Sequence, residues 1–124
     1  MIVPNARLQG YHAHVYYDAA TRPAAQQLAE AIADKFAVRI GGLFDEPVGP
    51  HPVPNLQIIF PTEAFAAVVP WLMLNRQGFD VLVHALTDDS VRDHDADAMW
   101  LGTPVRLRLD VLRPGYRAEL LPTA

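Results

Sequence analysis

Residues 11–17, with the sequence Tyr-His-Ala-His-Val-Tyr-Tyr, are the segment that most limits what this chain can fold into. Aromatic and β-branched residues dominate the segment, which favours a β-strand. Side chains of a strand alternate between its two faces, so His12, His14 and Tyr16 share one face. Residues two apart lie roughly 7 Å from each other, so both imidazoles could contact one metal ion or one small substrate. For this segment alone, two histidines on a solvent-facing sheet surface are the simpler interpretation.

Composition places the chain among small globular domains. Its 124 residues suffice for a sizeable core, so we expect a single domain over residues 1–124 with its core at about 11–112. Hydrophobic residues make up 51% of the chain, too many for a disordered protein. The net charge of −4 argues against nucleic acid as the main partner, because phosphate binding needs a basic surface. No apolar run could span a bilayer or act as a signal core, so we expect a cytoplasmic protein with no membrane partner.

Cysteine is absent, which restricts the available chemistry. Disulfides, thiolate metal sites and a cysteine nucleophile are excluded, so any metal must be bound by imidazole and carboxylate groups. Three further histidines stand in unusual surroundings. His51 lies between two prolines in a rigid loop at residues 45–54, and this restricted backbone could aim its side chain. A stiff surface hairpin with an incidental histidine is an equally simple interpretation.

The other two histidines also allow two interpretations each. His84 falls in the apolar segment 79–86, where a buried imidazole needs a partner, either a backbone group or a metal or substrate. His94 stands between Asp93 and Asp95, where it either forms a local ion pair in a solvated loop or takes part in catalysis. Together, the contexts of the five histidines favour a functional cluster.

The spacing of apolar residues predicts alternating strands and helices. Apolar residues recur every three or four positions over 22–36, which predicts an amphipathic helix with Pro23 in its first turn. A second helix is expected at about 63–76, kinked or shortened by Pro70. We expect strands at residues 11–17, 38–44, 55–60, 79–86 and 105–112, with residues 99–102 forming a turn anchored by a tryptophan.

The order of these elements matches the split βαβ pattern. The predicted fold is therefore an α+β ferredoxin-like sandwich with an antiparallel sheet of strand order 4-1-3-2, both helices on one face, and an added C-terminal strand. Ala13 and Val15 suit the helix-covered face, which leaves His12 and His14 on the open face with His84 beside them. That open face would need cover from loops, from the last strand or from another subunit, and we expect a homodimer.

Several short segments occur in a specific order along the chain. They are residues 11–17, Gly49-Pro50-His51-Pro52, Trp71-Leu72 with Asn75-Arg76, Val81-Leu82-Val83-His84, and Asp93-His94 with Trp100-Leu101-Gly102. This ordered set resembles the DOPA 4,5-dioxygenase family over residues 11–111. The chain departs from the family after His84, where a proline and a Thr-Gly turn are usual and Ala-Leu-Thr-Asp-Asp stands instead.

The resemblance implies a ferredoxin-like fold, usually dimeric, and extradiol cleavage of a catechol ring with non-haem Fe(II) and O2. The fungal members are associated with opening the ring of L-DOPA on the way to betalain-type pigments. Zinc or nickel could replace iron in a purified sample, since histidine ligation alone does not select the metal. The departure at residues 85–89 borders the expected pocket and therefore concerns substrate preference.

Under this hypothesis the metal ligands come from the histidines and one carboxylate. His14 and His84 are the first ligands, with His12 or His51 next. Glu46, which stands at the start of the proline-rich loop, is the candidate carboxylate. A site made of three histidines is the alternative.

Acid/base catalysis and substrate contacts fall to other residues. His51 or His94 is the acid/base candidate, because each lies on a loop that could close over a substrate. Tyr16, Arg76 and Trp100 are the expected substrate-binding residues. Arg76 could pair with a substrate carboxylate, although a charge complementing a helix C-terminus explains it equally well.

Two other functions fit the same residues. A non-catalytic dimer of this fold could bind an aromatic ligand or a metal ion as a sensor or carrier. Alternatively, the histidines could catalyse acid/base isomerisation of a small acid without a metal. Oxygen consumption in the presence of a catechol distinguishes the dioxygenase from both.

Overall fold

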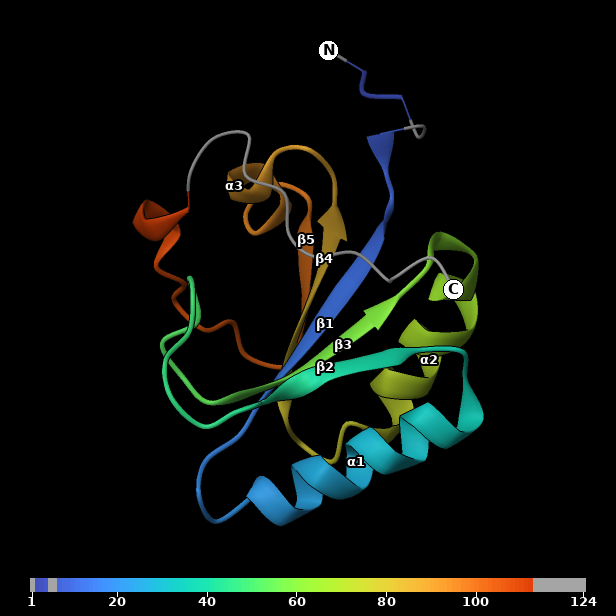
Figure 1. Ribbon diagram of the computed structural model, residues 1–124, viewed down its shortest axis with the longest axis vertical. Helices are drawn as coiled ribbons and strands as arrows, with labels where there is room; N and C mark the ends of the chain where they lie inside the picture. Colours follow the sequence, from blue (N-terminus) through green and yellow to red (C-terminus); the bar gives the residue numbers. More distant parts are fainter. Residues whose placement is uncertain (1, 5–6, 113–124) are drawn as a thin grey trace.

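A five-stranded antiparallel sheet forms the centre of the computed structural model, which describes residues 2–4 and 7–112. The strand order is β2-β3-β1-β4-β5, so the first four strands have the predicted ferredoxin-like arrangement. The expected domain limits at residue 1 and beyond residue 112 lie outside the described residues. Figure 1 shows α1 and α2 packed against the sheet. The strands are β1 (Gly10–Tyr16), β2 (Arg39–Phe44), β3 (Asn55–Phe60), β4 (Asp80–Leu86) and β5 (Ala98–Leu101).

Both predicted helices are present, with small differences at their ends. Helix α1 (Arg22–Lys35) buries its apolar stripe, and Pro23 lies in its first turn as expected. A 3₁₀ turn (Thr62–Ala64) precedes α2 (Phe65–Asn75), and α2 continues through Pro70. No helix within residues 2–4 and 7–112 is long and apolar enough to cross a membrane.

The alternation along β1 separates the hydrophobic core from the polar side of the sheet. Ala13 and Val15 are fully buried in the core, together with residues of both helices. His12, His14 and Tyr16 lie on the opposite, helix-free side. Because His12 pairs with His84 across the β1–β4 ladder, the fourth strand adds its histidine to that side. The predicted orientation of the first strand is therefore confirmed.

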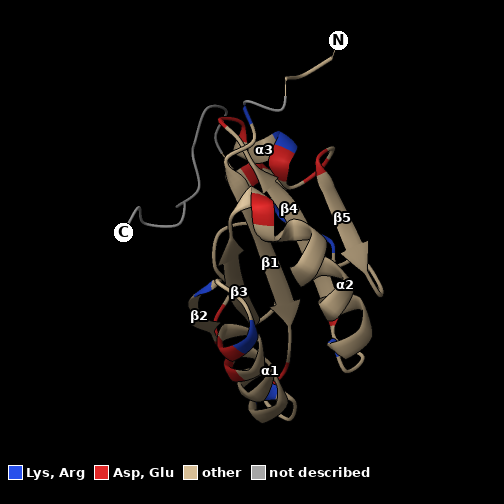
Figure 2. Ribbon diagram, turned by 90° about the vertical axis from the view of Figure 1, so that its right-hand side faces the viewer, with Lys and Arg blue, Asp and Glu red and all other residues tan. Residues whose placement is uncertain are grey.

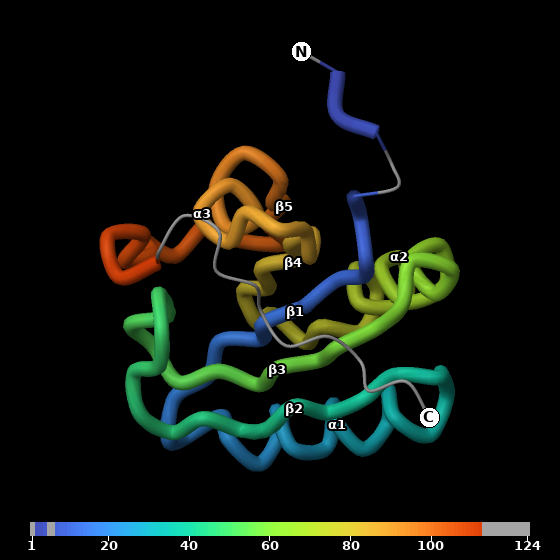
Figure 3. The backbone as a smooth tube through the Cα atoms, turned by 45° about the horizontal axis from the view of Figure 1, so that its top comes forward, coloured from blue at the N-terminus to red at the C-terminus, as the bar shows by residue number. Residues whose placement is uncertain are grey.

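Two connecting segments leave opposite ends of the sheet and reach over its helix-free side, where the rings of His51 and His94 lie with centroids 5.7 Å apart. The first is the proline-rich segment 45–54, and the second is the segment 87–97, which contains the short helix α3 (Ser90–Asp93). Figure 3 shows them close together, with the chain that follows β5 beside them. A hydrogen bond from the Arg108 N–H to the Pro50 carbonyl (2.8 Å) joins this following chain to the first segment.

The location of the fifth strand was predicted wrongly. Residues 98–101, which include three of the four residues of the expected tryptophan turn at 99–102, form β5 and pair with β4. Residues 105–108 form no strand, and Leu109–Val111 is a 3₁₀ turn. The reason is that β5 already occupies the free edge of β4, and Gly102 (φ +87°) then turns the chain away from the sheet.

Candidate metal centre

All five histidines of the chain meet on the helix-free side of the sheet. His12 and His14 come from β1, His84 from β4, His51 from the proline-rich segment and His94 from the end of α3. None of the five is more than 7% exposed. The ring centroids lie 3.9 Å apart for His14 and His51, 3.9 Å apart for His84 and His94, and 5.1 Å apart for His12 and His84.

A tight turn places His51 over the sheet. The backbone groups of Val48 and His51 bond to each other in both directions (3.1 and 2.9 Å), with Gly49 in the left-handed region at φ +52°. The prolines around this turn limit the alternative backbone conformations. The rigid loop expected from the sequence therefore aims its histidine inward, with the ring against that of His14.

Buried hydrogen bonds within the segment 87–97 position His94. The carboxylate of Asp93 is 1% exposed and accepts from both the N–H (2.8 Å) and the hydroxyl (2.6 Å) of Thr87. Burial raises the pKa of this carboxyl. Through its bonds to Thr87, Asp93 stabilises the segment that carries His94. His94 itself donates from Nδ1 to the carbonyl of Ser90 (2.7 Å).

Hydrogen bonds determine which ring nitrogen is protonated in three of the histidines. His14 Nδ1 lies 2.9 Å from Asn55 Oδ1, and His84 Nδ1 lies 2.8 Å from the carbonyl of Ala85. These oxygens, like the Ser90 carbonyl, can only accept, so Nδ1 must donate in each case. The Nε2 atoms of His14, His84 and His94 therefore carry lone pairs when the rings are neutral.

The Nε2 atoms of His14 and His84 lie only 3.1 Å apart. With both Nδ1 atoms protonated, two lone pairs face each other there, and a hydrogen bond would require one ring to become an imidazolium. Burial, followed by the neighbouring imidazoles, holds the pKa of both rings well below 6.5. A metal cation accepts both lone pairs without that cost, so this donor set fits a metal ion.

Two groups of three imidazoles are compact enough to bind a metal ion. In each group the ligand atoms lie within 4.8 Å of one another. His14 belongs to both groups, but only one group also contains His84. The groups are His12, His14 and His84, and His14, His51 and His94.

Burial also lowers the pKa values of His51 and His94. Burial, together with the charge that His94 would carry, lowers the pKa of His51 to about 3. Burial also lowers the pKa of His94, although its bond to the Ser90 carbonyl works in the opposite direction. His14, His51, His84 and His94 are therefore neutral at physiological pH and offer lone pairs to a cation or a proton donor.

Tyr16 and Trp100 form an aromatic wall beside the cluster. The Tyr16 hydroxyl lies 2.7 Å from His51 Nδ1, and its ring stacks on Trp100 with centroids 5.8 Å apart and an interplanar angle of 24°. Leu82 of β4 pairs with His14 on one side and with Trp100 on the other, which places the indole in the same row of side chains. A planar ring brought to the cluster would meet this wall.

Two residues that the sequence proposed for the site, Glu46 and Arg76, belong to neither imidazole group among the described residues. Glu46 is exposed on the proline-rich segment and belongs to neither compact group among the described residues. Arg76 follows α2 and donates from its guanidinium to the carbonyl of Phe79 (2.8 Å). This bond stabilises the turn between α2 and β4.

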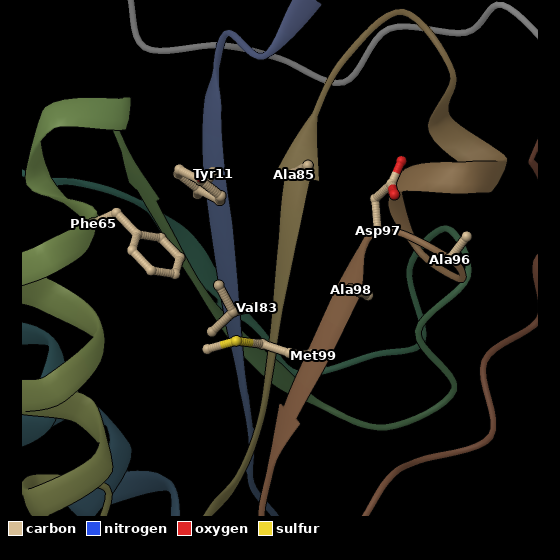
Figure 4. A pocket seen from close by; sticks show the side chains of 8 residues that line it. All are labelled: Tyr11, Phe65, Val83, Ala85, Ala96, Asp97, Ala98 and Met99. Atoms are coloured by element: carbon tan, nitrogen blue, oxygen red, sulfur yellow. The ribbon is translucent and has the colours of Figure 1, made fainter. Parts of the chain in front are cut away.

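A shallow groove of about 250 Å³ lies away from the histidines (Figure 4). Tyr11, Phe65, Val83 and Met99 give it an apolar lining, and Asp97, which pairs with Arg92 (2.7 Å), adds a charge at its edge. Because Tyr11 and Val83 face the helix layer, this groove is separate from the imidazole cluster.

Sequence reasoning did not identify two amides beside the cluster, Asn55 and Gln57. Both lie on β3, and their side chains contact Nδ1 of His14 (2.9 Å) and of His12 (3.3 Å), respectively. The available signal was their alternation with Leu56 and Ile58, which places both amides on the histidine side of the sheet.

Comparison with known proteins places the chain among dioxygenase-like sequences. The model of the Dopa 4,5-dioxygenase family matches residues 11–111. A DOPA 4,5-dioxygenase from Amanita muscaria is 34% identical over 119 residues, covering 86% of this chain and 51% of that protein. An uncharacterized 21.2 kDa protein from Botryotinia fuckeliana is 37% identical over 98 residues, covering 72% of this chain and 54% of that protein.

The chain thus spans about half the length of the curated relatives it matches. A solved structure, that of a candidate dioxygenase from Nostoc punctiforme, is similar over nearly its full length. It is 44% identical with a TM-score of 0.86, and the match covers 89% of this chain and 96% of that one.

Proposed function

Because the chain belongs to the Dopa 4,5-dioxygenase family, we propose that it is an extradiol dioxygenase that opens a catechol ring, such as that of L-DOPA at the 4,5 position, with non-haem Fe(II) and O2. The observation that carries the proposal is the 3.1 Å approach of the His14 and His84 Nε2 atoms. These two lone pairs lie beside the aromatic wall of Tyr16 and Trp100. A metal ion and an aromatic substrate could therefore bind next to each other in this site.

We assign the metal to His14 and His84, with His12 as the third ligand. This assignment is supported by the compact group that these three imidazoles form. When bound, Fe(II) supplies a route for electron density from a catecholate to dioxygen. The group of His14, His51 and His94 is the second candidate, since it has the same compactness.

In the first assignment His51 and His94 are the proton acceptors. Neutral His94 presents the lone pair of Nε2, so this atom can take up a proton from a catechol hydroxyl as the substrate binds. The low pKa of His51 keeps this ring unprotonated as well, and Tyr16 holds it in place from Nδ1. Tyr16 and Trp100 would orient the catechol ring by stacking.

Substrate entry requires movement of a covering segment. All five imidazoles are nearly buried, so a catechol can reach them only if the segment carrying His51 or the segment carrying His94 opens. The second of these begins with Thr87, Asp88 and Asp89, three of the five residues after His84 that depart from the family pattern, so it is also where we expect substrate preference to be set.

The test is anaerobic loading of the pure protein with Fe(II), followed by L-DOPA or caffeate and oxygen. Oxygen uptake with a new visible absorbance, absent without iron and in His84→Ala, would support the proposal. Metal binding without turnover across a panel of catechols would indicate a non-catalytic binding protein. Turnover of a small acid in metal-free protein would instead favour acid/base isomerisation.

We further propose a cytoplasmic homodimer that associates through the outer face of α2. This helix contains no charged residue, as Figure 2 shows by its uniform tan ribbon, and Met73 and Leu74 are 53% and 86% exposed. Two copies meeting there would bring no like charges together.

Light scattering should show a dimer that Leu74→Glu dissociates, whereas Gln27→Glu, which adds the same charge on exposed α1, should leave it intact. A monomeric wild type would reject the dimer.

A further inference from the structure

We propose that Asn55 is a positioning residue that holds His14 in the tautomer able to bind metal. The side chain of Asn55 is fully buried, and its Oδ1 lies 2.9 Å from His14 Nδ1. An amide oxygen can only accept, so the proton of neutral His14 is held on Nδ1 and the lone pair is left on Nε2. This inference rests on the proposed metal centre, which it extends to a residue outside the imidazole cluster.

The orientation of the Asn55 amide follows from its second hydrogen bond. Its Nδ2 donates to the carbonyl of Val53 (3.4 Å), and a flipped amide would set two oxygens against each other there. The backbone of Asn55 is held from both sides, since it pairs with Tyr16 of β1 and with Phe44 of β2. Asn55 Oδ1 therefore has little freedom to leave His14.

His14 is the imidazole for which such control matters most. It is the only residue shared by both compact groups, so its Nε2 is needed whichever group binds the metal. The tautomers of His84 and His94 are set by main-chain carbonyls, which no substitution can remove. For His14 the acceptor is a side chain, so a single residue of the sequence determines the tautomer.

Packing alone does not require an amide at this position. A leucine has the same branching and the same number of side-chain heavy atoms, and burying it would avoid the cost of desolvating an amide. It would, however, leave Nδ1 of His14 without an acceptor in a buried environment and free the proton to move to Nε2. The choice of asparagine is explained by the hydrogen bond to His14.

The experiment compares Asn55→Leu and Asn55→Asp with wild type and with Ile58→Val. Ile58 is fully buried on the same strand but faces the helices, so its variant controls for general loosening of β3. Zn(II) affinity is measured by competition with a chelator, and Co(II) spectra report the ligand set. Long-range ¹H–¹⁵N spectra of the metal-free protein report the His14 tautomer directly.

We expect Asn55→Leu to weaken Zn(II) binding by about 10- to 100-fold and to lose the pure Nδ1–H tautomer of His14. Asn55→Asp retains an acceptor and should keep the tautomer, with affinity within a few-fold of wild type. Ile58→Val should change neither. An unchanged tautomer and affinity in Asn55→Leu would overturn the proposal, as would equal losses in the leucine and aspartate variants.

Failure of the proposed function has a different signature. If the wild type bound neither Zn(II) nor Co(II), the metal centre would be rejected, and the role of Asn55 in metal binding with it. If the wild type bound metal but never consumed oxygen, only the dioxygenase would be rejected, because the tautomer and affinity measurements involve no turnover.

Discussion

The hydroxyl of Tyr16 and Nδ1 of His51 lie 2.7 Å apart, although the two residues are separated by 35 positions in the sequence. This bond joins the central strand of the sheet to the proline-rich segment, and it holds the His51 ring against that of His14. Under the proposed function, it determines where one acid/base group stands relative to the metal ligands.

Tyr16→Phe should therefore reduce turnover while leaving metal binding intact. We expect oxygen uptake with a catechol to fall by about 10- to 100-fold, since acid/base groups typically contribute 10²–10⁴ and misplacing His51 removes part of this. Tyr17→Phe is the matched control, because Tyr17 also makes a 2.7 Å hydroxyl bond, to Asp45, but on the helix side of the sheet. Equal activities in the two variants would contradict a catalytic role for His51.

Single alanine substitutions should separate metal ligands from acid/base groups. Under the first assignment, His14→Ala and His84→Ala should lose stoichiometric metal, whereas His94→Ala should keep it and lose turnover. Substitution of His12 should weaken metal binding if the first group is the site, and substitution of His51 should do so if the second group is. The measurement is metal content after dialysis, with circular dichroism as the check on folding. Full metal content in both His14→Ala and His84→Ala would overturn the ligand assignment.

Acid should destabilise the metal-free protein at a pH well above that at which carboxylates titrate. The pKa values of His14, His51, His84 and His94 are lowered in the folded protein, so the unfolded chain binds more protons below its ordinary histidine pKa of about 6.5. Stability is complete above that pH and is lost as the pH falls towards the folded pKa values. Each imidazole kept neutral costs about 1.4 kcal/mol per pH unit in this window.

Urea denaturation at pH 7.5, 6.5 and 5.5 would measure this effect. His84→Leu should flatten the dependence by about one proton. The raised pKa of Asp93 changes the stability in the opposite direction. It is a single carboxyl group, whereas four imidazoles have lowered pKa values, so the net effect of acid is destabilising. A free energy of unfolding that stays constant from pH 6.5 to 5.5 would show that the imidazoles are not held neutral.

The turn after β5 should tolerate no side chain at Gly102. Its φ of +87° would cost any other residue about 1–2 kcal/mol, and a Cβ there would lie 2.5 Å from Asp80 Oδ1. That oxygen accepts from the Thr103 N–H (2.7 Å), so displacing it also breaks a hydrogen bond. We expect Gly102→Ala to destabilise by about 2–4 kcal/mol.

Gly78 provides the comparison for this prediction. Its φ is +79°, but nothing lies within 4 Å of the position of a Cβ, so Gly78→Ala should cost only the backbone strain of about 1–2 kcal/mol. Thermal or urea unfolding of both variants would test the difference. Equal losses would mean that the close approach to Asp80 contributes nothing.

Most of the sheet was predictable because its strands carry strong local signals. The alternation in residues 11–17 and the uninterrupted apolar run around His84 identify β1 and β4, and their order implies that they are neighbours. The fifth strand was missed because four residues, Ala98–Leu101, are too few to show alternation, while residues 105–112 alternate without a partner. Pairing depends on which edge is free, and this is a property of the whole sheet.

The histidine cluster was predictable only in part. The shared face of His12, His14 and His84 follows from strand periodicity. The inward direction of His51 depends on a turn closed by backbone bonds, and that of His94 depends on Thr87 and Asp93, neither of which has a local sequence signature. The role of Asn55 could not be recognised, because it requires knowing that β3 lies beside β1 with Asn55 near His14.

Strand β1 carries its core residues and its imidazoles on alternate positions, with Ala13 between His12 and His14. The same parity rule therefore governs both folding and chemistry in this segment. Loss or gain of one residue within Gly10–Tyr16 would send the imidazoles into the helix layer and the aliphatic groups to the open side. A substitution in the strand changes one side chain and leaves the others on their faces. An insertion or deletion of one residue changes the face of every residue that follows it, so the strand cannot tolerate a change of length by one.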